Sequence, residues 1–446
     1  MSAALIERIA ERGLVDIDPK RGRFRVHRDA YRDQAVFERE KELIFAKCWL
    51  YVGHASELPN KGDYVSRTVG GRDLIFMRGR TGEIGAFFNS CTHRGTRVCR
   101  EKKGNTKTFS CPYHGWVFNT EGKLVSMNAD KGFAADINAD GSLDLRKVPR
   151  LEHHRGFYFV NYNPKAISLK EYLAGATDVL DSMCEQTEGE LLVLPGEHAY
   201  SINANYKYLC ENSYDGYHLL PVHVSYLEFL DDRMKASGNG SAVNFIANLY
   251  NKQGRGIGLG NGHGSLESWV PTGRPVASWI PPWGPEIKKE IDAKRAWLQQ
   301  KFGKERADFI SDVQKNMVIF PNLVINDNVG MIIRTIEPTS AMAMRVQSWA
   351  LGPNDESAAM RALRLDNFVS FLGPAGFGSA DDVEMLELCQ RGIQHTPVEW
   401  NELSRGMNGA VDSRVEICGP ADEGHMRAYW TQWDRVMRGL DTFEAR

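Results

Sequence analysis

The sequence has no strong charge imbalance and no apolar run long enough to span a membrane. Its 446 residues include 55 Lys and Arg against 57 Asp and Glu, for a formal net charge of -2. Near-neutral charge with 10% aromatic residues argues against intrinsic disorder and against a large nucleic-acid-binding surface. No segment approaches the roughly 20 apolar residues of a transmembrane helix, and the first residues lack the apolar core of a signal peptide. We therefore expect a cytoplasmic globular protein of two or three domains.

Cysteine is sparse, with 8 residues spread over the whole chain. That number is too small for a disulfide framework at this length, and in a reducing compartment clustered cysteines are more typical of metal ligands. Two of them, Cys91 and Cys111, lie close to histidines. Long low-complexity segments and internal repeats are also missing, which excludes a solenoid or a propeller.

The pattern of apolar residues changes along the chain. Residues 35–45 fit a short amphipathic helix, and residues 49–162 contain short β-rich runs between glycine turns, which is typical of a small all-β domain. After residue 164 the pattern is mixed and predicts an α+β domain in which helices cover an antiparallel sheet. The expected helices span residues 168–185, 285–309, 355–371, 380–391 and 425–438, and the expected successive strands span residues 317–320, 331–336 and 343–349.

Two short loops of the first region each offer one thiol and one imidazole. The first carries Cys91 and His93, the second carries Cys111 and His114, and a glycine follows each pair closely. This pattern favours a Rieske [2Fe–2S] cluster, in which the two cysteines hold one iron and the two histidines hold the other. Imidazoles in place of two thiolates make such a cluster less negative and raise its potential.

A structural zinc site is the alternative, because two thiolates and two imidazoles also suit Zn²⁺. Zinc sites of that composition usually pair like with like along the chain, whereas each loop here mixes the two ligand types. We expect Trp116, with Arg94 and Arg97, to shield and tune the cluster, and Cys99 to be a buried thiol.

A second group of metal-ligand residues follows in the mixed region. Residues 211–218 read Glu-Asn-Ser-Tyr-Asp-Gly-Tyr-His, and His223 comes shortly afterwards. Two histidines and one carboxylate, with coordination positions left open, are how non-haem Fe(II) oxygenases hold iron for dioxygen and substrate. Taken alone, the segment also fits a helix end at which His218 and His223 are merely polar and Asp215 is a cap. The residues leave open whether the third ligand is Asp215 or a carboxylate from elsewhere.

Both segments resemble the same family. The cluster loops, Cys-Thr-His-Arg-Gly and Cys-Pro-Tyr-His-Gly-Trp, are similar to those of Rieske proteins almost residue for residue, and the second loop lacks the cysteine that would form the extra disulfide of the respiratory type. The string Glu-Asn-x-x-Asp-x-Tyr-His, with the second histidine after it, resembles the iron-binding segment of large (alpha) subunits of Rieske aromatic ring-hydroxylating dioxygenases. The resemblance covers nearly the whole chain and in motif form is nearest to the benzoate and cumate type.

The resemblance implies a fold for the whole chain. It implies an all-β Rieske domain, residues 49–163, inserted in a catalytic domain that has an antiparallel sheet flanked by helices, residues 164–446. Residues 1–48 would form a helical segment that packs on the catalytic domain.

The resemblance also implies the remaining iron ligand. The family's carboxylate is the second of two adjacent aspartates after a Gly-Pro-Ala-Gly turn, which corresponds here to Asp382. A slip of one position in the match would exchange it for Asp381. The implied mononuclear iron is thus held by His218, His223 and Asp382.

In the family that the chain resembles, electrons cross between neighbouring subunits of an alpha3 trimer, or of an alpha3beta3 assembly with a small subunit. By position the bridge is Asp215, which would accept hydrogen bonds from His114 of one subunit and His218 of the next. The implied reaction adds both atoms of O₂ to an aromatic ring and gives a cis-dihydrodiol, with electrons from NADH. Residues 256–260 lack the preceding strand of a βαβ nucleotide site, so a separate reductase, with or without a ferredoxin, is expected.

The motif form favours a substituted aromatic acid, such as a benzoate or a cumate, as substrate. A carboxylate calls for a guanidinium partner, which Arg334 or Arg345 could supply, although either could also point to solvent. His263, in a glycine-rich segment, could line the pocket or be an exposed loop residue. Asn212 and Tyr217 are expected around the ligands or in the core.

Other functions share parts of this pattern. A Rieske monooxygenase or demethylase would have every metal residue, and a polycyclic or biphenyl-type hydrocarbon dioxygenase would differ in its substrate pocket. A pure electron-transfer Rieske protein would need neither His218, His223 and Asp382 nor this length.

Overall fold

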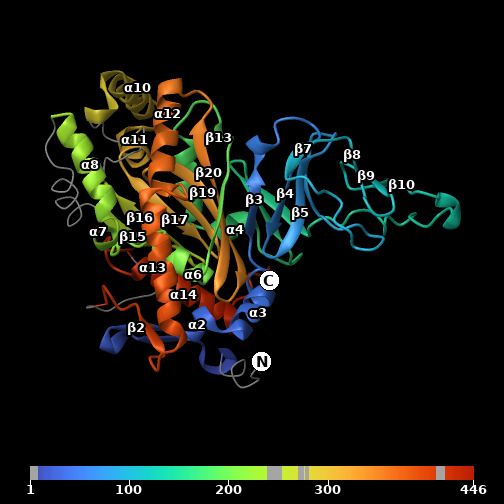
Figure 1. Cartoon of the computed structure of the whole chain (residues 1–446), viewed down its shortest axis with the longest axis horizontal. Coiled ribbons are helices and arrows are strands. Elements are labelled where there is room, and N and C mark those ends of the chain that lie inside the picture. The colour runs from blue at the N-terminus through green and yellow to red at the C-terminus, as the bar shows by residue number, and fades with distance from the viewer. Residues whose placement is uncertain (1–8, 239–253, 270–275, 277–280, 408–416, 446) are drawn as a thin grey trace. The chain divides into compact units, whose positions relative to one another are not determined.

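The computed structural model describes residues 9–238, 254–269, 276, 281–407 and 417–445. The chain forms two compact units, of which one comprises residues 1–44 and 170–442 and the other residues 45–169 and 443–446 (Figure 1). The second unit is therefore inserted in the sequence of the first. Within the described ranges, no helix is long and apolar enough to cross a membrane.

The inserted unit is built from short antiparallel strands. A four-stranded sheet has the order β6-β5-β4-β7, and two three-stranded sheets have the orders β10-β9-β8 and β11-β12-β3. The strands are β3 (Leu50–His54), β4 (Asp63–Val69), β5 (Arg72–Arg78), β6 (Ile84–Phe88), β7 (Lys103–Asn105), β8 (Thr108–Ser110), β9 (Val117–Asn119), β10 (Leu124–Ser126), β11 (Arg150–His154) and β12 (Phe157–Asn161).

The turn between β4 and β5 shows why this unit is rich in glycine. Gly70 and Gly71 have φ angles of 57° and 77°, in the left-handed region that side chains disfavour. The turn sets the register in which Val69 faces Arg72 and the apolar side chains of β5 enter the core.

The larger unit is organised around a nine-stranded antiparallel sheet. Its order is β13-β20-β19-β18-β17-β16-β15-β22, and β14 also pairs with β20. The strands are β13 (Leu191–Val193), β14 (His198–Ile202), β15 (Gly254–Gly260), β16 (His263–Ser268), β17 (Gln314–Ile319), β18 (Leu323–Asp327), β19 (Met331–Ser340), β20 (Ala343–Pro353) and β22 (Ile417–Cys418).

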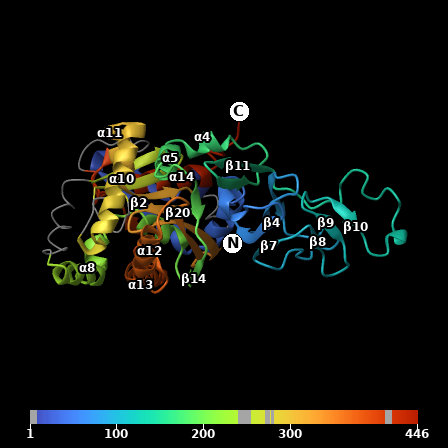
Figure 2. The same ribbon diagram turned by 90° about the horizontal axis from the view of Figure 1, so that it is seen from above.

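Helices cover this sheet on both sides, with α12 and α13 on one and α5 and α14 on the other (Figure 2). Helix α14 packs on β15 and β16, α5 on β17, and α6 on β19. The helices are α4 (Leu169–Leu173), α5 (Ala176–Cys184), α6 (Tyr206–Asn212), α7 (Leu219–Val222), α8 (Val224–Ala236), α10 (Pro285–Phe302), α11 (Lys304–Ser311), α12 (Ala358–Asn367), α13 (Phe377–Gln394) and α14 (Gly424–Met437), and the π-helix η5 (Phe368–Leu372) follows α12. The predicted α+β class is confirmed.

The N-terminal segment belongs to the larger unit. Strands β1 (Val15–Asp18) and β2 (Arg23–His27) form a small sheet with β21 (Trp400–Glu402), and helices α2 (Asp29–Arg32) and α3 (Gln34–Leu43) follow. Glu40 of α3 forms a fully buried ion pair with Lys207 of α6 at 2.6 Å. This pair joins the N-terminal segment to the helix that leads into residues 211–218.

The sequence pattern missed three local features. The helix expected over residues 168–185 is divided between α4 and α5, where Ala174 has a φ angle of 46°. The helix expected over residues 285–309 is divided at Gly303, which has a φ angle of 79°. The sequence pattern does not predict strand β18, which lies between two expected strands. Its residues, Leu323–Asp327, are all buried and show no alternation of polar and apolar side chains.

Candidate functional site

The two loops with Cys91 and Cys111 have the same backbone turn. The amide of Gly95 donates to the carbonyl of Cys91 at 2.8 Å, and the amide of Gly115 donates to the carbonyl of Cys111 at 3.0 Å. Both glycines have left-handed φ angles, of 74° and 70°. The glycine behind each pair is therefore needed because a side chain there would strain the turn that presents the ligands.

The four cluster residues are brought together with the thiols inside. Cys91 and Cys111 are buried in the same core cluster of the inserted unit, where their thiols are neighbours. Burial first, and then the neighbouring thiol, raise the pKa of Cys91. The rings of His93 and His114 lie 4.5 Å apart and are both partly exposed. Two deep thiols facing two shallower imidazoles are the asymmetric donor set of a Rieske cluster.

Neighbouring side chains hold this donor set in place. The ring of Trp116 stacks on His93 at 4.8 Å with an interplanar angle of 8°. The Nδ1 atom of His93 is buried and has no hydrogen-bond partner among the described residues, as suits a ligand atom. Arg97 instead points to Asp73, with Nε 3.7 Å from Oδ2, and Arg94 is exposed.

Asn89 is a supporting residue that the sequence did not indicate. Its Oδ1 accepts from the amides of Val98 and Cys99 at 3.0 and 2.8 Å, and its Nδ2 donates to the carbonyl of Cys99 at 2.7 Å. Cys99 is a buried thiol, as expected, and its Sγ donates to the carbonyl of Glu101. Asn89 thereby fastens the end of the first cluster loop to the strand that precedes it.

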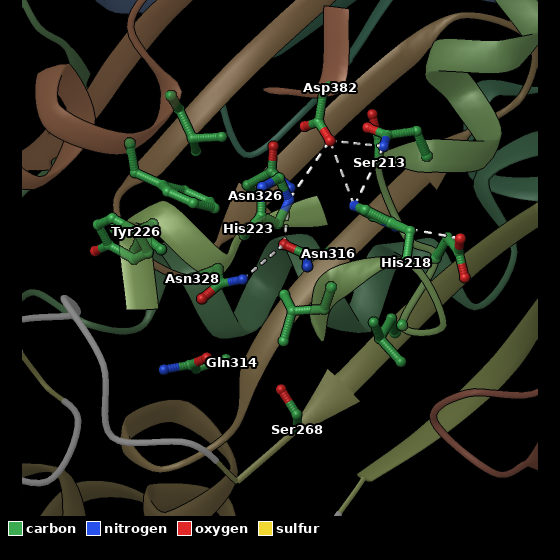
Figure 3. Close-up of a pocket in the computed structure, with 18 of the residues that line it drawn as sticks. Ser213, His218, His223, Tyr226, Ser268, Gln314, Asn316, Asn326, Asn328 and Asp382 are labelled. Atoms are coloured by element: carbon green, nitrogen blue, oxygen red, sulfur yellow. Dashed lines mark hydrogen bonds and ion pairs between the residues drawn. The ribbon is translucent and has the colours of Figure 1, made fainter. Parts of the chain in front are cut away.

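His218, His223 and Asp382 converge in the larger unit (Figure 3). One ligand atom from each lies within 4.8 Å of the others. The Oδ1 atom of Asp382 is 3.4 Å from Nε2 of His218 and 3.5 Å from Nε2 of His223. The two histidines lie at either end of the short helix α7, whereas Asp382 comes from α13, which packs against α6 and α8.

The structure separates the two adjacent aspartates. Asp382 is buried and also accepts a 2.9 Å hydrogen bond from Nδ2 of Asn212. Asp381 accepts from the hydroxyl of Ser225 at 3.2 Å, and its Oδ2 is 3.7 Å from the far nitrogen, Nδ1, of His223. Asp382 therefore faces the point of convergence, and Asp381 faces the back of one imidazole.

The charge distribution around these three residues suits the binding of a cation. Burial lowers the pKa of His218, but hydrogen bonds to Asp215 and Asp382 outweigh it and raise the pKa to about 9. Burial raises the pKa of Asp382, but His218 and His223 outweigh it, so that this pKa is lowered. Two imidazole nitrogens and one carboxylate oxygen around a common point, beside a cavity, fit the open coordination of Fe(II).

Asp215 supports His218 from behind. Its Oδ2 lies 3.2 Å from Nδ1 of His218, and its Oδ1 accepts from the amide of Tyr217 at 2.7 Å. Tyr217 is not a core residue, because its side chain is 56% exposed and the guanidinium of Arg405 lies over its ring.

Glu211, the first residue of segment 211–218, stabilises the fold through buried hydrogen bonds. It accepts 2.6 Å hydrogen bonds from the hydroxyl of Tyr31 and from Nε1 of Trp430. Burial raises its pKa to about 7, although both donors oppose the shift. Glu211 thereby links α6 to segments near both ends of the chain.

The ligand set opens onto a cavity whose apolar residues come mainly from helices α7 and α8 and the π-helix η5, which we call its apolar wall. Its polar residues, which include the guanidinium of Arg334, come mainly from the strands of the sheet, which we call its polar wall. The apolar residues include Leu219, Tyr226, Leu227, Leu230, Leu266, Val329, Phe371 and Leu372, and the polar ones include Ser213, Ser268, Gln314, Asn316, Asn326 and Asn328.

Three residues of the substrate predictions are now placed. Arg334 is 3% exposed and lines the cavity, so it does not point to solvent, whereas Arg345 is exposed on β20. The two readings of His263 are both wrong, because it is completely buried in β16 and is not a cavity residue. Its Nε2 donates to the carbonyl of Tyr172 and its Nδ1 accepts from the amide of Phe320.

The sequence carries no distinct signal for the polar wall. Gln314, Lys315 and Asn316 are consecutive polar residues at the start of β17, and Asn326 is followed by Asp327 at the end of β18, so no alternation singles out the side chains that line the cavity. Asn316 and Asn326 face each other in register, and Nδ2 of Asn326 donates to Oδ1 of Asn316 at 2.7 Å. Only the register of the strands shows which of these polar residues share one face of the sheet.

An inserted domain with a Cys₂His₂ donor set and a two-histidine, one-carboxylate site define a Rieske non-haem iron oxygenase. Residues 48–143 match the family model of the Rieske [2Fe-2S] domain, and residues 190–439 match that of the ring-hydroxylating alpha subunit catalytic domain. The chain belongs to the ring-hydroxylating alpha subunit family and is an aromatic ring-hydroxylating dioxygenase subunit, which confirms the resemblance. It carries a Rieske [2Fe–2S] cluster and a mononuclear non-haem iron.

Similar proteins support this family assignment. The chain is 35% identical over 442 residues to the 2-halobenzoate 1,2-dioxygenase large subunit of Burkholderia cepacia, covering 96% of this chain and 92% of that one. It is 33% identical over 405 residues to the anthranilate 1,2-dioxygenase large subunit of Acinetobacter baylyi, covering 88% and 83%. A solved naphthalene 1,2-dioxygenase variant bound to phenanthrene superposes with a TM-score of 0.83 at 25% identity, covering 96% and 95%.

Proposed function

We propose that this chain is a terminal oxygenase subunit that adds both atoms of O₂ to the ring of an aromatic carboxylic acid, such as a benzoate or a cumate, and gives a cis-dihydrodiol. The observation that carries the proposal is the convergence of His218, His223 and Asp382 beside a cavity with an apolar wall. An apolar wall suits the faces of an aromatic ring. The names of the relatives add support, because 2-halobenzoate and anthranilate are aromatic acids.

The proposal assigns a role to each part of the chain. Residues 49–163 form the Rieske domain, residues 164–446 the catalytic domain, and residues 1–48 pack on the latter. In the cluster, Cys91 and Cys111 bind one iron and His93 and His114 the other. When bound, the cluster supplies single electrons and the mononuclear iron supplies open positions for O₂ and substrate.

The chain's own residues then position the reactants. His218, His223 and Asp382 form one end of the cavity, and Asp215 and Asn212 hold the donor atoms through the contacts at 3.2 and 2.9 Å. Fixing the imidazole of His218 from behind orients its free nitrogen and raises its basicity. The leucines and aromatic side chains of the apolar wall exclude water from the ring that is to be hydroxylated.

We further propose an assembly for electron delivery. Electrons from NADH arrive through a separate reductase, with or without a ferredoxin, and the subunit works as an alpha3 trimer or with a small subunit as alpha3beta3 in the cytoplasm. Asp215 would join His114 of one subunit to His218 of the next. Its carboxylate is compatible with this role because 22% of its side chain remains exposed in the single chain.

Labelled oxygen provides the test. The holoenzyme, supplied with NADH and a compatible reductase, should convert benzoate under ¹⁸O₂ to a cis-diol that contains two ¹⁸O atoms. His223→Ala, which removes one proposed iron ligand, is the inactive control. One incorporated atom would instead indicate a monooxygenase or demethylase. Turnover of naphthalene or biphenyl, with none of benzoate, would indicate a hydrocarbon dioxygenase.

A further inference from the structure

Arg334 occupies an unusual place for an arginine. It lies in β19, is 3% exposed, and lines the same cavity as the iron ligands. Its Nη2 donates to Oδ1 of Asn326 at 2.9 Å and reaches the hydroxyl of Ser213 at 3.4 Å. Its Nε is buried without a hydrogen-bond partner among the described residues. The guanidinium is therefore only partly satisfied.

No carboxylate of the described residues lies within ion-pair distance of Arg334, although two other buried arginines have one. Arg364 pairs with Glu356 at 2.9 Å, and Arg67 pairs with Glu57 at 2.6 Å. Arg427 is buried as well, but it donates to two backbone carbonyls. A buried charge without a counterion is costly, and such a site favours binding of an anion that supplies the missing charge.

The surroundings of Arg334 suit a ligand that is anionic at one end only. The polar wall near it consists of uncharged amides and hydroxyls, which include the labelled Asn316, Asn326 and Ser213 (Figure 3). The acidic residues of the cavity, Asp215 and Asp382, contact His218 instead. An aromatic acid can thus place its carboxylate at Arg334, among uncharged polar groups, and its ring along the apolar wall.

The guanidinium is also connected to the iron ligands through a short chain of contacts. Ser213, which it contacts, directly follows Asn212, and Asn212 donates to Asp382. A small aromatic acid bound to Arg334 would therefore present its ring beside the ligand set. We infer that Arg334 binds the carboxylate of the substrate and selects aromatic acids over uncharged arenes, an inference that rests on the proposed function. A guanidinium can bind a carboxylate through two parallel hydrogen bonds.

The test compares two ligands of similar shape, benzoate and benzamide, of which only the first is charged. Binding to the iron-loaded holoenzyme without reductase is measured by calorimetry. Arg334→Gln should weaken benzoate binding by about 10- to 100-fold, the range expected for lost hydrogen bonds to a charged group, and leave benzamide binding unchanged. Arg345→Gln, an exposed arginine of the neighbouring strand, is the matched control and should bind both ligands as the unmodified protein does.

A second variant keeps the arginine. Asn326→Asp is close to isosteric and places a carboxylate where Oδ1 already accepts from Nη2 of Arg334 at 2.9 Å. This internal counterion should compete with the substrate, so benzoate binding should again fall at least tenfold while benzamide binding is kept. If Arg334→Gln fails to fold, as judged by the Rieske spectrum and iron content, Asn326→Asp decides by the same criterion.

The outcomes separate the inference from the proposed function. A loss of benzoate affinity smaller than tenfold, or an equal loss for benzamide, would overturn the role of Arg334 while benzoate dihydroxylation by the unmodified enzyme would still support the proposed function. If the unmodified holoenzyme neither bound nor converted benzoate or another aromatic acid, the proposed function would be wrong, and the inference with it.

Discussion

Asp215 Oδ2 lies 3.2 Å from Nδ1 of His218, on the side of the imidazole that faces away from Asp382. The imidazole is thus held between two carboxylates, one at each ring nitrogen. A carboxylate behind a metal-bound imidazole fixes its orientation and raises its basicity. This contact exists within one chain, so it does not depend on the proposed assembly.

Replacing Asp215 tests its role in electron transfer. Asp215→Asn keeps the size and one acceptor but removes the negative charge that would hold His114 and His218. We expect both metal centres to be retained, while reoxidation of the reduced cluster by O₂ and substrate slows by about 10- to 100-fold. Stopped-flow absorbance in a single turnover measures this rate. Reoxidation at the normal rate would show that Asp215 is a local cap and that electrons take another route.

The two adjacent aspartates give a matched pair of variants. Asp382→Asn should abolish binding of the mononuclear iron, because it removes the charge that faces both Nε2 atoms at 3.4 and 3.5 Å. Asp381→Asn should retain iron, because Asp381 contacts Ser225 and only the far nitrogen of His223. Metal analysis and the Rieske spectrum distinguish the two. Loss of iron from Asp381→Asn alone would reverse the assignment.

The cluster ligands predict a loss of colour. Cys91→Ser should remove the [2Fe–2S] cluster, its visible absorption and its EPR signal, because a hydroxyl is a poor substitute for a buried thiolate. Cys99→Ser is the control, since that thiol is buried nearby but donates to the carbonyl of Glu101. Zinc in the unmodified protein, without iron and acid-labile sulfide, would contradict the cluster assignment.

His263 predicts a component of acid sensitivity. Burial lowers its pKa to about 4, although the hydrogen bond to Tyr172 opposes the shift. The unfolded chain, with a histidine pKa of about 6.5, therefore binds this proton more readily, and the folded state loses stability as the pH falls from about 6.5 to 4. Between pH 7 and pH 5 the loss should be about 2 kcal/mol.

Unfolding experiments can isolate that component. His263→Gln retains one donor and one acceptor for Tyr172 and Phe320 but cannot take up the proton. The variant should be less stable than the unmodified protein at pH 7, yet the fall in its unfolding free energy between pH 7 and pH 5 should be smaller. An unchanged pH dependence would mean that His263 does not contribute to acid sensitivity.

Local sequence pattern was enough to indicate the cluster site and two of the three iron ligands. Each cluster loop carries its cysteine and histidine within four residues of one another, and Gly95 and Gly115 allow the turn that presents them. His218 and His223 are similarly close in sequence. Ligands that are close in sequence are positioned by local backbone conformation, so their spacing in the sequence is enough to indicate the site.

Local sequence pattern did not predict the breaks between helices or the fully buried strand. Ala174 divides α4 from α5 with a left-handed φ angle that few alanines adopt, whereas Gly175, the neighbour that would be expected to take such an angle, has a helical φ of -65°. The apolar run of β18 has no alternation, because it is buried on both faces. The position of His263 was also predicted wrongly, because its glycine-rich segment is typical of a loop but is in fact a paired strand.

The sequence by itself determined the class of the protein, the cluster ligands, the two histidines of the iron site and the pairing of a small β domain with a larger α+β domain. Only the tertiary structure decided which aspartate faces the histidines, because successive residues of α13 point about 100° apart and the packing of α13 on α6 and α8 selects one direction. The same holds for the polar wall. Asn316, Asn326 and Arg334 come from three strands, and only the register of those strands places them on one face of the cavity, where the buried guanidinium has no carboxylate partner in the part of the chain that the structure describes.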